Sequence, residues 1–200
     1  LFGNRFVKFI PDYILVAGSK KKQKYRKSFN IKIIDFNTWD NSNLKLANFK
    51  KIKKKHIVLV DGAGPFSISD RELLGKRHYL TKEVWYKHLD SFFDKLEKYF
   101  KCKIIIANHP NTKVGTYPKH FYGRKAISGK TLNLIKDSKF ILTRQSTALS
   151  HALYFKKPIV LIYSNQNKKD FYDISIIKNI SQMTQSQIIN INEKIDLRKF

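Results

Sequence analysis

The sequence is short of cysteine, of acidic residues and of long apolar runs. Its single cysteine, Cys102, excludes a disulfide within the chain and fits a reducing compartment. No apolar run reaches the roughly 18 residues of a membrane-spanning helix, so we expect no such segment. Hydrophobic residues nevertheless make up 42% of the 200 residues, which indicates a folded domain rather than a disordered tail.

Acidic residues are scarce: 15 Asp and Glu stand against 40 Lys and Arg, giving a formal net charge of +25. Such a charge attracts polyanions, including nucleic acid, anionic lipid headgroups and nucleotide-linked substrates. The lysines are spread along the chain, which is also what a Lys-, Ile- and Asn-rich composition produces. Neither zinc-ligand spacing nor an RNA-binding sheet motif is present, so we expect peripheral contact with an anionic membrane and no specific nucleic-acid partner.

The pattern along the chain predicts alternating strands and helices. Apolar runs at 13–18 and 31–36 precede a polar, basic stretch at 40–55 that is typical of a linker. Beyond it, the sequence predicts strands at 56–60, 103–107, 124–127, 140–143 and 158–163, with helices at 81–100, 132–136 and 146–155. The longest helix carries apolar residues at three- and four-residue spacing, and Thr81 is placed to cap it.

Short connections in such an alternation favour a doubly wound parallel α/β sheet. We therefore expect residues 51–200 to form a Rossmann-like domain, and residues 1–50 to be the end of an incomplete N-terminal domain with its linker. The sequence begins at Leu1 rather than Met, which suggests a piece of a longer chain. Ligands of parallel sheets bind at the carboxyl ends of the strands.

Residues 139–164 are expected to form a strand–helix–strand unit that presents Gln145, Ser146 and Thr147 at a helix N-terminus. The first N–H groups of a helix attract phosphate, and the two hydroxyls add hydrogen bonds. Alternatively, Ser146 is only the helix cap. His109, held before Pro110 at a strand end, can donate to a phosphate or protonate a leaving group, or else it bonds a neighbouring loop.

Two further motifs follow predicted strands. Asp61 precedes Gly62 and can deprotonate an acceptor hydroxyl, although Asp-Gly is also a common turn. Gly129-Lys130-Thr131 matches the tail of a phosphate-binding loop, but Arg124 stands where that loop needs glycine. A kinase or ATPase is thereby excluded, while Arg124 and Lys130 remain candidate contacts for a diphosphate. The histidines form no metal-ligand spacing, so we expect no metal site.

Taken together, residues 104–110, 140–148 and 157–159 resemble the C-terminal donor-binding domain of bacterial GT-B glycosyltransferases of surface polysaccharide synthesis. That group includes capsule and lipopolysaccharide enzymes and sialyltransferases, and the resemblance covers about residues 57–164. It implies metal-independent transfer of a sugar from a nucleotide-sugar donor to a saccharide or glycolipid acceptor. The nucleotide sugar is a substrate, and no cofactor is implied. The expected location is the cytoplasm, at the inner face of the plasma membrane.

The resemblance also implies roles for single residues. His109 matches the histidine that contacts the donor phosphate, and Asp61 matches the acidic residue that acts as general base. The residues expected to bind the donor phosphate are Gln145, Ser146, Thr147, Arg124 and Lys130. Two rival functions remain open at this point: a nucleotide-sugar epimerase of the same fold, and a basic module that binds nucleic acid or a membrane surface.

Overall fold

The computed structural model describes residues 12–16, 32–35, 44, 56–62, 75, 79–110 and 121–200. The chain divides into two units, Leu1–Asn48 and Phe49–Phe200. In the first unit, β1 (Tyr13–Val16) pairs in parallel with β2 (Lys32–Asp35). Both strands lie where the sequence predicts apolar runs.

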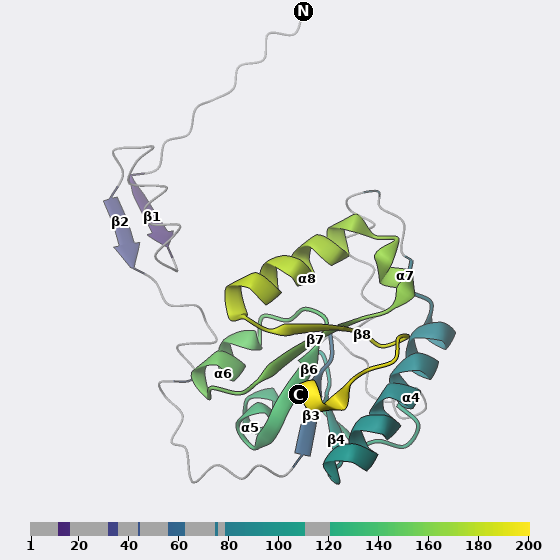
Figure 1. The fold of residues 1–200 in the computed structure, drawn as a ribbon. Helices are drawn as coiled ribbons and strands as arrows, with labels where there is room; N and C mark the ends of the chain where they lie inside the picture. Colours follow the sequence, from purple (N-terminus) through teal and green to yellow (C-terminus); the bar gives the residue numbers. More distant parts are fainter. Residues whose placement is uncertain are drawn as a thin grey trace, which may run out of the picture. The chain divides into compact units, whose positions relative to one another are not determined.

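The second unit holds a six-stranded sheet whose neighbouring strands all pair in parallel, in the order β5-β4-β3-β6-β7-β8 (Figure 1). The expected Rossmann-like, doubly wound α/β fold is therefore confirmed. The strands are β3 (His56–Val60), β4 (Ile104–Ala107), β5 (Ala126–Ile127), β6 (Ser138–Thr143), β7 (Ile159–Tyr163) and β8 (Gln187–Asn190).

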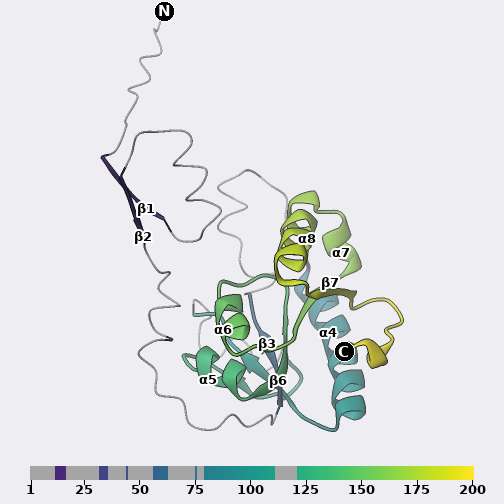
Figure 2. The ribbon, with the colours of Figure 1, turned by 60° about the vertical axis from the view of Figure 1, so that its left-hand side comes forward.

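Helices cover both faces of this sheet (Figure 2). One face carries α4 (Lys82–Phe100), and the other carries α5 (Thr131–Lys136), α6 (Leu149–Tyr154) and α8 (Phe171–Thr184). The short helix α7 (Asn165–Lys168) precedes α8, and a 3-10 turn, η2 (Leu197–Lys199), lies near the end of the chain. Strand residues alternate between the faces: Ile57 and Leu59 belong to the core under α4, and Val58 and Val60 to the other core.

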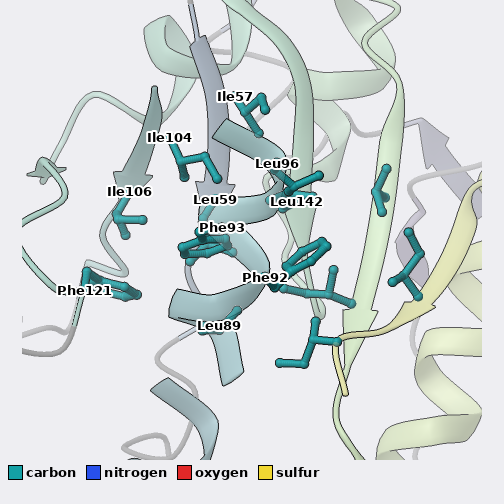
Figure 3. Packing of buried hydrophobic residues seen from close by; sticks show 14 of the residues in the cluster. Ile57, Leu59, Leu89, Phe92, Phe93, Leu96, Ile104, Ile106, Phe121 and Leu142 are labelled. Carbon is teal, nitrogen blue, oxygen red and sulfur yellow. The ribbon is translucent and has the colours of Figure 1, made fainter. Parts of the chain in front are cut away.

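Helix α4 packs on the sheet through large side chains at helical spacing (Figure 3). Leu89, Phe92, Phe93 and Leu96 are almost completely buried there, against strand residues such as Ile106. Burying a side chain of this size contributes about 1.5–3 kcal/mol. This helix is the element that the sequence pattern predicts best, because its apolar stripe repeats over five turns.

Two expectations need correction. The helix expected at 146–155 comprises only Leu149–Tyr154, because residues before it form a turn in which Ser146 O accepts from Leu149 N at 3.3 Å. Thr81 stands at the cap position of α4 without a side-chain capping bond. Elements beyond residue 163 were not predicted. Helix α8 is apolar on several sides, so its sequence lacks the clear stripe by which α4 was recognised.

Candidate functional site

The strand order reverses between β3 and β6, at the centre of the sheet. From β3 the chain proceeds to β4 on one side, and from β6 it proceeds to β7 on the other. The chain therefore leaves the ends of β3 and β6 toward opposite sides of the sheet. In open parallel sheets, this switch point is where ligands bind.

Asp61 directly follows β3 at this point and is 7% exposed. Its backbone N–H donates to Ala107 O at 3.0 Å, which continues the ladder to β4. The neighbouring Gly62 lies against the loop after β6: a Cβ added there would sit 3.0 Å from Gln145 O. The two loops are therefore in contact, and residue 62 has no space for a side chain unless the Gln145 backbone moves.

The ends of β4 and β5 are joined beside this point. Asn108 N donates to Ile127 O at 3.0 Å, and its side-chain amide donates to Ser128 Oγ at 3.2 Å. His109, the next residue, is half-buried. Gly129 has a φ of 70°, a left-handed conformation that strains any other residue. Lys130 is exposed at the start of α5, so its ammonium group is available at the carboxyl edge.

The turn after β6 supplies the remaining predicted residues. Thr143 Oγ1 donates to Val60 O at 3.0 Å and ties the ends of β6 and β3 together. Ser146 Oγ accepts from Ala148 N at 3.2 Å, so the serine closes a local turn. The cap interpretation of Ser146 is wrong, because α6 begins at Leu149 with Ala148 at its cap position, and Ser146 lies in the turn before it. Gln145 is half-buried and Thr147 is exposed on the same turn.

Sequence reasoning missed Arg144, which is 6% exposed at the switch point. Its guanidinium Nη1 lies 3.7 Å from Asp173 Oδ2, and the Asp173 side chain is itself buried. Asn167 Nδ2 donates to the same carboxylate oxygen at 3.1 Å, and Asn167 Oδ1 accepts from Ser164 N at 2.9 Å. A signal was available in the sequence: an arginine that directly follows a buried apolar strand needs a charged partner.

Arg124 lies away from the other predicted residues. It precedes β5, at the amino end of that strand, and its guanidinium is paired with Asp90, Asp94 and Glu97 of α4. Burial acts to lower the pKa of Arg124, but hydrogen bonds and charge from these carboxylates raise it above its ordinary value. This geometry argues against a role for Arg124 in binding a donor phosphate at the carboxyl edge.

A cavity of about 670 Å³ adjoins Arg124, lined by its three carboxylate partners and by residues of β4 such as Ile104 and Ile105. Glu97 closes part of the β4 edge here, because its Oε1 accepts from Ile104 N at 2.8 Å. The cavity therefore belongs to the amino side of the sheet and not to the switch point.

Asp61 follows β3 at the carboxyl edge of the sheet. Five more of the predicted site residues follow the ends of three further strands at the same edge: His109, Lys130, Gln145, Ser146 and Thr147. Within the described ranges, no three His, Cys, Asp or Glu side chains are grouped as metal ligands would be. The helices of those ranges include none with both the length and the apolar content to cross a membrane.

No known family profile matches the chain, and no curated protein matches its sequence. Among solved structures, the chain is similar to one described as the "Glycotransferase of kitacinnamycin", with a TM-score of 0.36 and 11% sequence identity. The match covers 74% of this chain and 34% of that one, so this chain spans about a third of the length of its structural neighbour.

Proposed function

We propose that this chain carries the donor-binding half of a metal-independent glycosyltransferase of the GT-B type. The donor is a nucleotide sugar, and the acceptor is a hydroxyl group of a saccharide or glycolipid in surface polysaccharide synthesis. The observation that carries the proposal is that Asp61, His109, Lys130 and the 145–147 turn all follow the carboxyl ends of strands in one parallel sheet, the edge at which such sheets bind ligands.

One feature of this edge suits a nucleotide sugar. The donor's phosphate groups would meet Lys130 and the hydroxyls of Ser146 and Thr147, and Ser146 keeps its local bond to Ala148 N while its hydroxyl still has a proton and a lone pair to offer.

The proposed reaction is a single displacement or its stepwise equivalent at the anomeric carbon. Asp61 accepts the proton of the acceptor hydroxyl as its oxygen forms the new bond to that carbon. The bond between the anomeric carbon and the phosphate oxygen breaks, and the nucleoside phosphate departs. His109 donates to the departing phosphate, and Lys130 offsets part of its charge.

Two measurements test this proposal on the full chain together with its acceptor domain. In the first, CMP-, UDP-, GDP- and dTDP-linked sugars are screened by thermal shift. Stabilisation by one nucleotide class is expected, since a ligand at 100 times its Kd adds about 2.7 kcal/mol. In the second, nucleotide release is followed with and without a saccharide acceptor; release that requires no acceptor would favour the epimerase.

The variants Asp61→Asn and His109→Ala are expected to slow acceptor-dependent nucleotide release by about 10²–10⁴-fold, the usual contribution of a general acid or base. His88→Ala is the matched control, because His88 is also half-buried but belongs to α4, outside the carboxyl edge. Native rates in both site variants would overturn the proposal.

A further inference from the structure

The sheet face covered by α5, α6 and α8 carries an excess of positive charge. Residues 128–185, which supply these helices and the strands β6 and β7, contain nine Lys and Arg and only three acidic residues. Two of those acids, Asp170 and Asp173, are buried, and Asp137 lies 3.6 Å from the ammonium group of Lys136. Exposed lysines therefore dominate the surface of this face; they are Lys130, Lys156, Lys168, Lys169 and Lys178, of which Lys168 pairs with Glu193.

The same face leaves large apolar side chains in solvent. Phe171 is 87% exposed and Met183 is 80% exposed, the highest values among the large hydrophobic residues of the described ranges. Both belong to α8, at its first and last turns. Tyr172 on α8 and Leu153 and Tyr154 on α6 are also exposed. Several large apolar side chains left in solvent on two helices of one face, together with exposed lysines, favour an interaction surface.

A cavity of about 380 Å³ adjoins α8 on this face. Its apolar lining comes from β7, α8 and β8, and two lysines stand among the lining residues, which are Tyr163, Ile174, Ile177, Ile188, Lys168 and Lys178. An apolar hollow with ammonium groups at its side suits an amphiphile with an anionic head.

We propose that the outer face of α6, α7 and α8 docks on a bilayer that contains anionic phospholipid. Each lysine near an anionic membrane contributes to attraction, and Phe171 and Met183 gain by entering the boundary between headgroups and acyl chains. A nucleic acid would use the lysines but has no need of an exposed methionine or of an isoleucine-lined cavity. The proposal goes beyond glycosyl transfer and does not depend on it.

The test is co-sedimentation of the full chain with vesicles of phosphatidylcholine alone and of phosphatidylcholine mixed with phosphatidylglycerol. Binding is expected only to the mixed vesicles and is expected to weaken as salt is raised. The charge variant Lys169→Glu/Lys178→Glu is expected to bind at least tenfold more weakly. Its matched control is Lys87→Glu/Lys95→Glu, which makes the same change at exposed positions of α4 and is expected to lose much less.

The apolar variant Phe171→Ser/Met183→Ser keeps the net charge and is expected to bind the mixed vesicles several-fold more weakly. Tyr99→Ser, half-exposed on α4, is its control. Because the substituted side chains are mostly exposed, all variants should have the same unfolding temperature as the native protein. Circular dichroism checks this. Equal losses in the α4 and α8 charge variants would overturn the proposal, and so would binding that ignores Phe171 and Met183.

Other occupants of this face are excluded by the same set of proteins. The membrane proposal is wrong if the native protein does not bind vesicles but self-associates in light scattering or binds a single-stranded RNA, and the α8 variants abolish that activity. The surface would then serve a second copy or a nucleic acid. Vesicle binding by a native protein that neither self-associates nor binds RNA supports the proposal.

Discussion

The two faces of the sheet are covered in different ways. On one face, the 19-residue helix α4 buries a continuous apolar stripe and carries four acidic residues and four lysines. On the other face, α5 and α6 have six residues each and α8 has 14, and exposed lysines and apolar side chains remain on their outer surface. Both faces bury a core against the same strands, so the difference lies in what each shows to its surroundings.

This difference separates folding from function. The α4 face has few large apolar residues left over, and three of its four acidic side chains are bound by Arg124. These carboxylates therefore make their contacts within the fold. The α8 face keeps both charge and apolar area outside, where they contribute nothing to packing. We expect substitutions on the first face to change stability and substitutions on the second to change binding.

The largest expected effect is loss of stability on removing a side chain from under α4. Phe92→Ala should lower the free energy of unfolding by about 3–5 kcal/mol, because Phe92 is almost completely buried and leaves a cavity. Phe171→Ala, which removes the same side chain from the exposed surface of α8, should change it by less than about 0.5 kcal/mol. Urea unfolding measures both. Similar values for the two variants would refute the comparison.

Next in size is the charge cluster on the α4 face. Arg124→Gln leaves Asp90, Asp94 and Glu97 without the cation that joins them, and we expect a loss of about 1–3 kcal/mol in the free energy of unfolding. Urea titrations at neutral pH measure this.

Arg198→Gln is the control for Arg124→Gln, because Arg198 also pairs with a carboxylate, that of Asp196, but its side chain is 82% exposed. No measurable change is expected for it. An Arg124→Gln protein as stable as the native one would show that the cluster is solvated and does not hold α4 to β5.

A smaller effect is expected where the two faces meet. Gln166 of α7 accepts from Thr81 N at 3.2 Å and donates to Thr81 Oγ1 at 3.0 Å, so it holds the residue that precedes α4 against α7. Gln166→Ala should cost about 0.5–1 kcal/mol, since water replaces part of these exposed bonds. Hydrogen exchange at the first turn of α4 should accelerate, while Gln182→Ala on the exposed side of α8 should leave it unchanged.

The sequence predicted what depends on local pattern. The stripe of α4, the β-branched strand β3 and the turn at Gly129 are each visible within a few residues, and the structure has them where expected. The partners of Arg124 are 27 to 34 residues away in the sequence, and no local pattern reveals them. The start of α6 was predicted wrongly for another reason. Ser146 closes a turn, and a serine in a turn cannot be told from a serine at a helix cap by its local sequence.

The smallest expected effect concerns the ion pair between Lys168 and Glu193, whose Nζ and Oε1 atoms lie 2.8 Å apart at the edge of the α8 face. Hydrogen bonds from Lys168 and Asn190 lower the pKa of Glu193, and the bond to Glu193 raises the pKa of Lys168. The stabilisation is therefore present at neutral pH. It is lost as the pH falls through the lowered pKa of Glu193, and again as the pH rises through the raised pKa of Lys168. Glu193→Gln should lower the unfolding temperature slightly at neutral pH and leave it unchanged at both extremes.

Glu193→Gln also tests the difference between the two faces. It leaves the charge of Lys168, which lines the cavity beside α8, without its carboxylate partner. On the proposed membrane surface, an uncompensated lysine adds attraction, so Glu193→Gln should bind anionic vesicles more tightly while the protein becomes slightly less stable. Asp94→Asn on α4 removes an acidic charge of the same size and should leave vesicle binding unchanged. A gain in vesicle affinity of equal size in both variants would mean that net charge alone, and not the α8 face, governs the attraction.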